Sequence, residues 1–117
     1  MKRLAILLAF LPAVLWAQDT TNASSAMLRA LDKVNGTVID IEMSQGQTRR
    51  YGLLEITMQE CRFPTDDPSG NAYVLMTIRE VNAEAPVFQG WMVASSPALN
   101  ALDHARYDVW PLRCITS

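Results

Sequence analysis

The sequence predicts an all-β fold, a small antiparallel β-sandwich or partly open barrel with one short helix near the C-terminus. Apolar and polar residues alternate in several short runs, turn residues recur about every 8–12 positions, and one stretch alone has helical spacing. The chain has 117 residues, a length that suits one domain.

Residues 1–17 have the pattern of a cleaved signal peptide. Lys2 and Arg3 precede an apolar run of 13 residues, Leu4 to Trp16, and the small Ala17 stands where cleavage is expected. The run is shorter than the about 20 residues that a bilayer requires. A retained anchor helix or a buried core helix is the alternative. We predict a periplasmic or secreted chain with no transmembrane segment after cleavage.

Residues 18–26, QDTTNASSA, are small and polar, so we expect a disordered leader followed by a single domain over residues 27–117. Without residues 1–17 the chain keeps 8 Lys and Arg against 12 Asp and Glu, a formal charge of −4. Its cations are scattered and form no basic stripe, which argues against nucleic acid as a partner.

The first two predicted strands form a hairpin. The segments MLRALDKV and TVIDIEM flank Asn35 and Gly36, a pair typical of a two-residue type I′ turn. In the second arm Ile39, Ile41 and Met43 alternate with polar residues, as in a half-buried strand.

Two longer strands are predicted next. Residues 53–61, LLEITMQEC, and residues 72–81, AYVLMTIREV, both alternate, and the Pro- and Asp-containing residues 62–71 form the loop between them. Cys61 falls on the polar face of its strand. Either a bulge shifts the alternation before it, or the cysteine lies at the strand end.

Residues 87–94, VFQGWMVA, are apolar at both parities, which predicts a central strand covered on both sides. Residues 95–104, SSPALNALDH, predict the short helix, with Ser95 or Ser96 as its N-cap and Pro97 at its first position.

The last predicted strand is RYDVWPLRC, residues 106–114. Pro111 cannot donate to a ladder and therefore indicates an edge strand. Trp110, Leu112 and Cys114 are expected to share one face.

Cys61 and Cys114 are the two cysteines, and in an exported chain they predict a structural disulfide. A reactive or metal-binding thiol pair is the alternative. Neither cysteine lies in a CxxC motif or near the histidine, so the sequence favours the disulfide.

His104 is the only histidine, and with Asp103 or Asp108 it suggests a small hydrolase. A nucleophilic serine must contact its base. Ser96 precedes His104 by eight residues, about 12 Å of helix. The Gly-x-Ser-x-Gly motif is also missing from the sequence. Ser95 and Ser96 are better interpreted as helix caps, and no catalytic residue is assigned.

The segment DDPSGN resembles a calcium loop through Asp67, Ser69 and Asn71. Ala72 and Ile78, however, occupy the positions that require glycine and a bidentate glutamate. We predict an ordinary turn, with no metal and no cofactor.

Five aromatic residues are candidates for a platform that stacks on sugar rings, although the core and rim of a small sandwich also use such residues. They are Tyr51, Tyr73, Trp91, Tyr107 and Trp110. Trp91 has the opposite parity from Phe88 and Met92, so one of these sets is expected to face away from the main core.

Two segments, ALDKVNGTVIDIEMSQGQTRRYGLLEITMQEC and PVFQGWMVASSPALNALDHARYDVWPLRC, resemble the Gram-negative secreted proteins catalogued as domain of unknown function 2155. The resemblance extends from about Ala26 to Cys114. The family usually has a proline after the histidine, where this chain has Ala105. The resemblance implies an exported domain with paired cysteines, and the family supplies no activity or catalytic residue.

Three functions follow in order of preference. The first is a non-catalytic periplasmic domain that binds a protein or another cell-envelope component. The second is a glycan- or peptidoglycan-binding module that uses the aromatic residues, and the third is a small hydrolase acting through His104.

Overall fold

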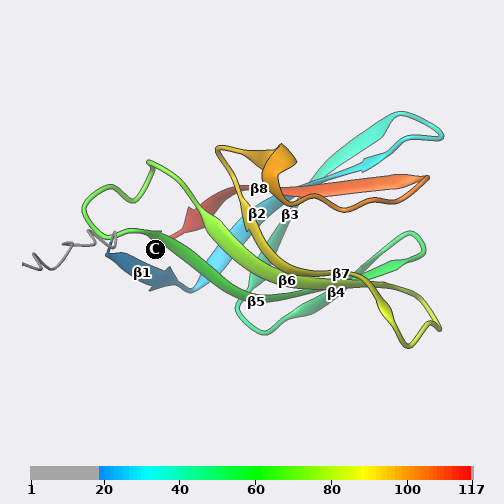
Figure 1. The fold of residues 1–117 in the computed structure, drawn as a ribbon, viewed down its shortest axis with the longest axis horizontal. Helices are drawn as coiled ribbons and strands as arrows, with labels where there is room; N and C mark the ends of the chain where they lie inside the picture. The colour runs from blue at the N-terminus through cyan, green and yellow to red at the C-terminus, as the bar shows by residue number, and fades with distance from the viewer. Residues whose placement is uncertain (1–18, 117) are drawn as a thin grey trace, which may run out of the picture.

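Residues 19–116 form two antiparallel sheets around one core in the computed structural model (Figure 1). One sheet has the order β1-β5-β6-β7, with β4 also paired to β5, and the other has the order β3-β2-β8. The predicted all-β fold class is confirmed, and the sheets do not close into a barrel. The elements are β1 (Thr20–Ala23), β2 (Ser25–Asp32), β3 (Thr37–Ser44), β4 (Thr48–Tyr51), β5 (Leu54–Pro64), β6 (Tyr73–Glu80), β7 (Pro86–Val93), the 3₁₀ turn η1 (Pro97–Leu99) and β8 (Tyr107–Ile115).

The leader predicted over residues 18–26 is wrong where the structure describes it, because β1 and the start of β2 occupy residues 20–26. Strand β1 pairs with the end of β5, and Ala23 lies opposite Cys61. Backbone pairing orders this polar segment, and its small Ala23 and Ala26 are buried. The domain therefore begins before residue 27. The signal-peptide prediction lies outside the described residues.

The β2–β3 hairpin is confirmed, but its turn is wider than predicted. Asp32 pairs with Thr37, so residues 33–36 form a four-residue loop instead of a type I′ turn. Gly36 has a φ of 76°, and its N–H donates to the carbonyl oxygen of Asp32 over 2.8 Å. The Asp32 carboxylate also accepts a hydrogen bond from the N–H of Val34, which holds the wider loop.

The core contains the inward-facing residues of both sheets, and the alternation predicted for β5 and β6 is confirmed. In β3, Ile41 and Met43 are buried, whereas Ile39 is 39% exposed. The two sheets diverge toward the tips of the β2–β3 and β4–β5 hairpins (Figure 1). We call this the open end of the sandwich.

Strand β7 is an edge strand, so the prediction of a central strand is wrong. Phe88 and Met92 are buried, whereas Trp91 is 39% exposed. Apolar residues occur at both parities because one face of β7 joins the core and the other carries an exposed aromatic ring. The central strands of this sheet are β5 and β6.

Strand β8 lies at an edge, as Pro111 predicts, but Trp110 and Cys114 do not share one face as predicted. Tyr107, Val109 and Pro111 are buried, whereas Trp110 is half-buried on the other side of the strand. The pairing of β8 with β2 then skips Leu112. This β-bulge reverses the alternation, and Cys114 therefore enters the core.

A second bulge resolves the position of Cys61. The pairing of β5 with β6 skips Gln59, so Cys61 moves from the polar parity into the core and is fully buried. The Sγ atoms of Cys61 and Cys114 lie 2.07 Å apart, at bonding distance. The pair joins β5 of one sheet to β8 of the other.

The connector, residues 94–106, contains only the short turn η1 in place of the predicted helix, and the side chain of Ser96 forms no capping hydrogen bond. A helix over residues 95–104 would span about 15 Å. The connector instead runs back along β8, whose nine residues span about 30 Å. An extended chain is therefore needed, and Leu102 anchors it in the core. Within residues 19–116 no helix has the length and apolar character that a membrane span requires.

Candidate functional site

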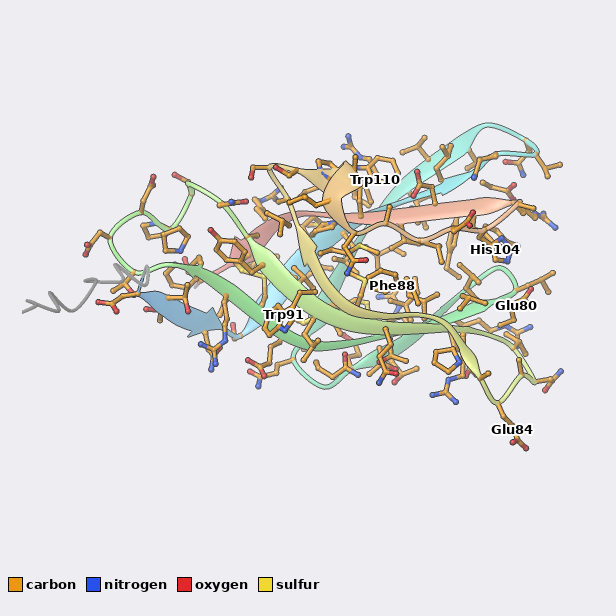
Figure 2. The ribbon with its side chains drawn as sticks, viewed as in Figure 1. Glu80, Glu84, Phe88, Trp91, His104 and Trp110 are labelled. Carbon is orange, nitrogen blue, oxygen red and sulfur yellow. A yellow bond between two sulfur atoms is a disulfide. The ribbon has the colours of Figure 1, made fainter. Side chains whose placement is uncertain are left out.

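His104 lies at the open end of the sandwich, close to the end of β6 (Figure 2). Its Nδ1 accepts hydrogen bonds from the N–H groups of Arg106, over 3.0 Å, and Tyr107, over 3.2 Å. Because Nδ1 is an acceptor, the ring proton is on Nε2, which donates to Oε2 of Glu80 over 3.3 Å. Both ring nitrogens therefore hold the start of β8 in place.

The geometry does not support a hydrolase acting through His104. Within residues 19–116 its ring forms no hydrogen bond with Asp103, Asp108 or either serine of the connector. A base needs a free acceptor nitrogen toward its nucleophile, and the acceptor nitrogen here is occupied by two backbone donors. His104 positions the chain as it enters β8.

An ion pair ties the β2–β3 hairpin to the same region. Nη2 of Arg106 lies 3.0 Å from Oδ2 of Asp32, and its guanidinium carbon lies 5.1 Å from the centre of the Tyr107 ring. The N–H of Lys33 donates to the carbonyl oxygen of Arg106 over 2.7 Å. The hydrogen bonds from Arg106 lower the pKa of Asp32.

Asp32→Asn is expected to reduce the acid sensitivity of the fold. The folded-state pKa of Asp32 lies below its ordinary value of 3.8, so its carboxylate stabilises the fold above that pH. This contribution is lost as the pH falls through the lowered pKa. Chemical denaturation at about pH 7 and about pH 3 measures the loss of unfolding free energy, which should be smaller in the variant than in the wild type.

Asp103→Asn is the matched control, because Asp103 is exposed and has no ion pair within residues 19–116. It should lose as much unfolding free energy on acidification as the wild type. An equal loss in Asp32→Asn would contradict the role given to Asp32.

The five candidate aromatic residues lie in three places and form no single platform. Tyr51 and Tyr107 meet at the open end, with ring centroids 5.5 Å apart and planes at 68°. Tyr73 and Trp91 lie on the outer face of the larger sheet, two residue pairs apart along β6 and β7. Trp110 lies on β8 of the other sheet (Figure 2).

The segment that resembled a calcium loop is a turn. The Gly70 N–H donates to the carbonyl oxygen of Asp67 over 2.9 Å, and Oδ1 of Asn71 accepts from two backbone N–H groups. Within the described part of the chain no three His, Cys, Asp or Glu side chains gather as metal ligands would.

A row of three hollows follows the free edge of β8. Their volumes are about 300, 160 and 530 Å³, and the last two share Ser69, Leu112 and Arg113. Strand β8 pairs with β2 alone among the described strands. Beyond its other edge lie the connector and the loop between β5 and β6. We call this the β8 groove, and its main lining residues are Pro97, Ala98, Ala101, Trp110, Leu112 and Arg113.

The side chains of two asparagines hold in place the wall of the groove that lies opposite β8. Oδ1 of Asn71 accepts from the N–H groups of Ala72, over 2.8 Å, and Ser95, over 3.0 Å, which joins the β5–β6 loop to the connector. Nδ2 of Asn100 donates to the carbonyl oxygen of Trp91 over 2.8 Å, which joins the connector to β7. From the sequence, Asn71 is a candidate only as a calcium ligand and Asn100 is not singled out, because asparagine is common in loops and its presence there is only a weak signal.

The chain matches along most of its length the bacterial family described as "Uncharacterized protein conserved in bacteria (DUF2155)", over residues 26–114. The chain belongs to this family. The resemblance identified from the sequence is thereby confirmed. The region matched to DUF2155 extends from the second residue of β2 to Cys114 and includes both cysteines and the connector.

A similar protein is an uncharacterised protein of Rickettsia prowazekii (strain Madrid E), which is 28% identical over 103 residues. The similarity covers 86% of this chain and 66% of the relative, so the chain spans just under two thirds of that protein's length. No solved structure matches this member of DUF2155.

Proposed function

We propose that the protein is a non-catalytic binding domain of the bacterial cell envelope, which holds a protein or another envelope component in the β8 groove. The observation that carries this proposal is the groove itself, an unpaired strand edge that faces a wall held in place by Asn71 and Asn100. A preformed groove loses little conformational entropy when it binds a partner.

The lining of the groove suits recognition. Trp110 and Leu112 are half-buried on β8, and Pro97, Ala98 and Ala101 are exposed on the opposite wall. Burial of such apolar surface favours binding by about 25 cal/mol per Å². Asp108 and Arg113 add one charge of each sign, which supplies orientation and specificity.

Export to the envelope is part of the proposal. It is supported by the signal-peptide pattern predicted for residues 1–17 and by a cysteine pair at bonding distance, which fits an oxidising compartment.

Ala98→Trp is expected to block binding by filling the groove. Ala98 is exposed, so the fold should tolerate the larger side chain. The oxidised protein is incubated with envelope fractions and with peptidoglycan sacculi, and bound material is quantified by mass spectrometry. The wild type should retain a specific component, and the variant should retain about tenfold less.

Leu99→Trp is the matched control, because Leu99 lies on the same turn, is 74% exposed and does not line the groove. It should bind like the wild type. Undiminished binding by Ala98→Trp would place the site elsewhere, and a wild type that retains nothing above background would refute the binding function.

A further inference from the structure

We propose that the β8 groove binds an extended peptide segment of another envelope protein, which pairs with β8 as an added antiparallel strand. This inference rests on the proposed binding function and names its partner. Addition of a strand to an open sheet edge is a common mode of peptide recognition, in which main-chain hydrogen bonds supply affinity and side-chain pockets supply specificity.

The register of β8 identifies the backbone groups available for pairing. Arg106 accepts a hydrogen bond from Lys33 of the neighbouring strand segment, and alternate residues of an antiparallel strand point to the same side. The carbonyl group of Arg106 and the backbone groups of Asp108 and Trp110 therefore face β2. Those of Tyr107, Val109 and Pro111 face the opposite edge, and Pro111 lacks an N–H.

Val109 is the central pairing position. Its N–H and C=O both face the groove, and none of the backbone hydrogen bonds made outside the strand ladders within residues 19–116 engages them. The N–H of Tyr107 is already bonded to His104. An added strand would thus donate to and accept from Val109, and would donate to the carbonyl oxygen of Pro111.

The charges of Asp108 and Arg113 predict which charged residues the bound strand carries. Asp108 and Arg113 lie toward opposite ends of the groove, and neither forms a salt bridge within 4 Å in the described part of the chain. The hydrogen bonds from Arg29 lower the pKa of Asp40, and the charge of Arg113 helps to lower it. On the β2 side of the strand, Asp108 pairs with Leu31 and Arg113 pairs with Met27. Because of the bulge at Leu112, these two partners are four residues apart in sequence. An antiparallel partner therefore has an acidic residue opposite Arg113 and, four positions later, a basic residue opposite Asp108.

The middle position of this pattern lies opposite Trp110. Side chains on the same face of neighbouring strands contact one another, so an apolar side chain there would pack on the indole ring. The expected segment is thus acidic-x-apolar-x-basic, in extended conformation.

The test uses two capped heptapeptides of equal composition, TETVTKT and its reverse TKTVTET. Each is titrated into the oxidised, isotopically labelled protein, and amide chemical shifts are followed by NMR. We expect TETVTKT to shift amides of β8 and the connector, to slow hydrogen exchange at Val109, and to bind at least about threefold more tightly than TKTVTET. Methylation of the backbone nitrogen of the fifth residue of TETVTKT, the threonine opposite Val109, should weaken binding further, because that N–H donates to the carbonyl oxygen of Val109.

A charge-exchanged protein provides the matched control. In the double variant Asp108→Lys/Arg113→Glu both changes are at surface positions, and the preference should reverse in favour of TKTVTET. Equal binding of the two peptides, shifts confined to the β3 edge, no shifts at all, or self-association through β8 would each overturn the inference. After any of these results, the proposed binding function would still hold if the wild type captured an envelope component and Ala98→Trp did not. It would be refuted as well if the wild type captured none.

Discussion

Replacing Cys61 or Cys114 with alanine is expected to lower the free energy of unfolding by about 4 kcal/mol. The bond closes a sequence separation of 53 residues and adds a covalent link between the side chains of the two sheets, from β5 to β8. Its loss gives the unfolded chain more conformational freedom, which favours unfolding. Domains of this size have about 5–15 kcal/mol of stability, so the loss is a large share.

The coupling of the two substitutions distinguishes a shared bond from two independent buried thiols. The double variant Cys61→Ala/Cys114→Ala should be little less stable than either single variant, because one substitution already removes the bond. Urea denaturation of the oxidised proteins measures this, and the reduced wild type should resemble the variants. Additive losses, or two alkylated thiols per unreduced, denatured wild-type chain, would contradict the disulfide.

Gly52→Ala is expected to destabilise the protein by about 2–5 kcal/mol. Gly52 has a φ of +57°, which costs a residue with a Cβ about 1–2 kcal/mol. A Cβ at this position would also overlap the hydroxyl of Tyr107, which accepts a hydrogen bond from the N–H of Leu53 over 3.1 Å. Overpacking of this kind costs about 1–3 kcal/mol. The turn before β5 is thus fixed by contact with a buried ring of β8.

Gly46→Ala separates the two contributions, because Gly46 has a φ of +83° but no neighbouring atom within 4 Å of the place that a Cβ would occupy. Its free energy of unfolding should fall only by the backbone contribution, about 1–2 kcal/mol. Tyr107→Phe removes the nearest overlapping atom, so Gly52→Ala should cost less in that background than in the wild type. Denaturation midpoints of the four variants provide the measurement, and a cost at Gly52 no larger than at Gly46 would contradict the contact.

Local alternation predicts strands well where one face is buried along the whole strand. Leu54, Ile56 and Met58 identify the first half of β5 for this reason. The same rule fails at Cys61, because the bulge at Gln59 depends on how β5 pairs with β6. The bulge at Leu112 has the same effect on Cys114.

The place of a strand in its sheet is less accessible to sequence analysis. An exposed Trp91 makes the edge strand β7 resemble a central one, and the pairing of β1 with β5 orders a segment that lacks large apolar residues. In both cases the neighbouring strand decides the outcome, and local composition does not identify that neighbour.

The candidate site was beyond prediction because distant segments build it. The side chain of Asn71 accepts a hydrogen bond from Ser95, and Ala98 and Trp110 line the same hollow, although neither pair is linked by a local motif. The sequence does identify Trp110 among the candidate aromatic residues, and the long separation of His104 from Ser96 along the chain already argues against hydrolysis.

Photo-crosslinking from position 110 tests the central claim most directly. Benzoylphenylalanine replaces Trp110 in the groove in one variant and Trp91 on the outer face of the other sheet in a second, so that each change exchanges one aromatic side chain for another. Ultraviolet irradiation of cells should yield a covalent adduct with an envelope protein from position 110 and none from position 91. Adducts from position 91 alone, or from neither position, would contradict a binding site in the β8 groove.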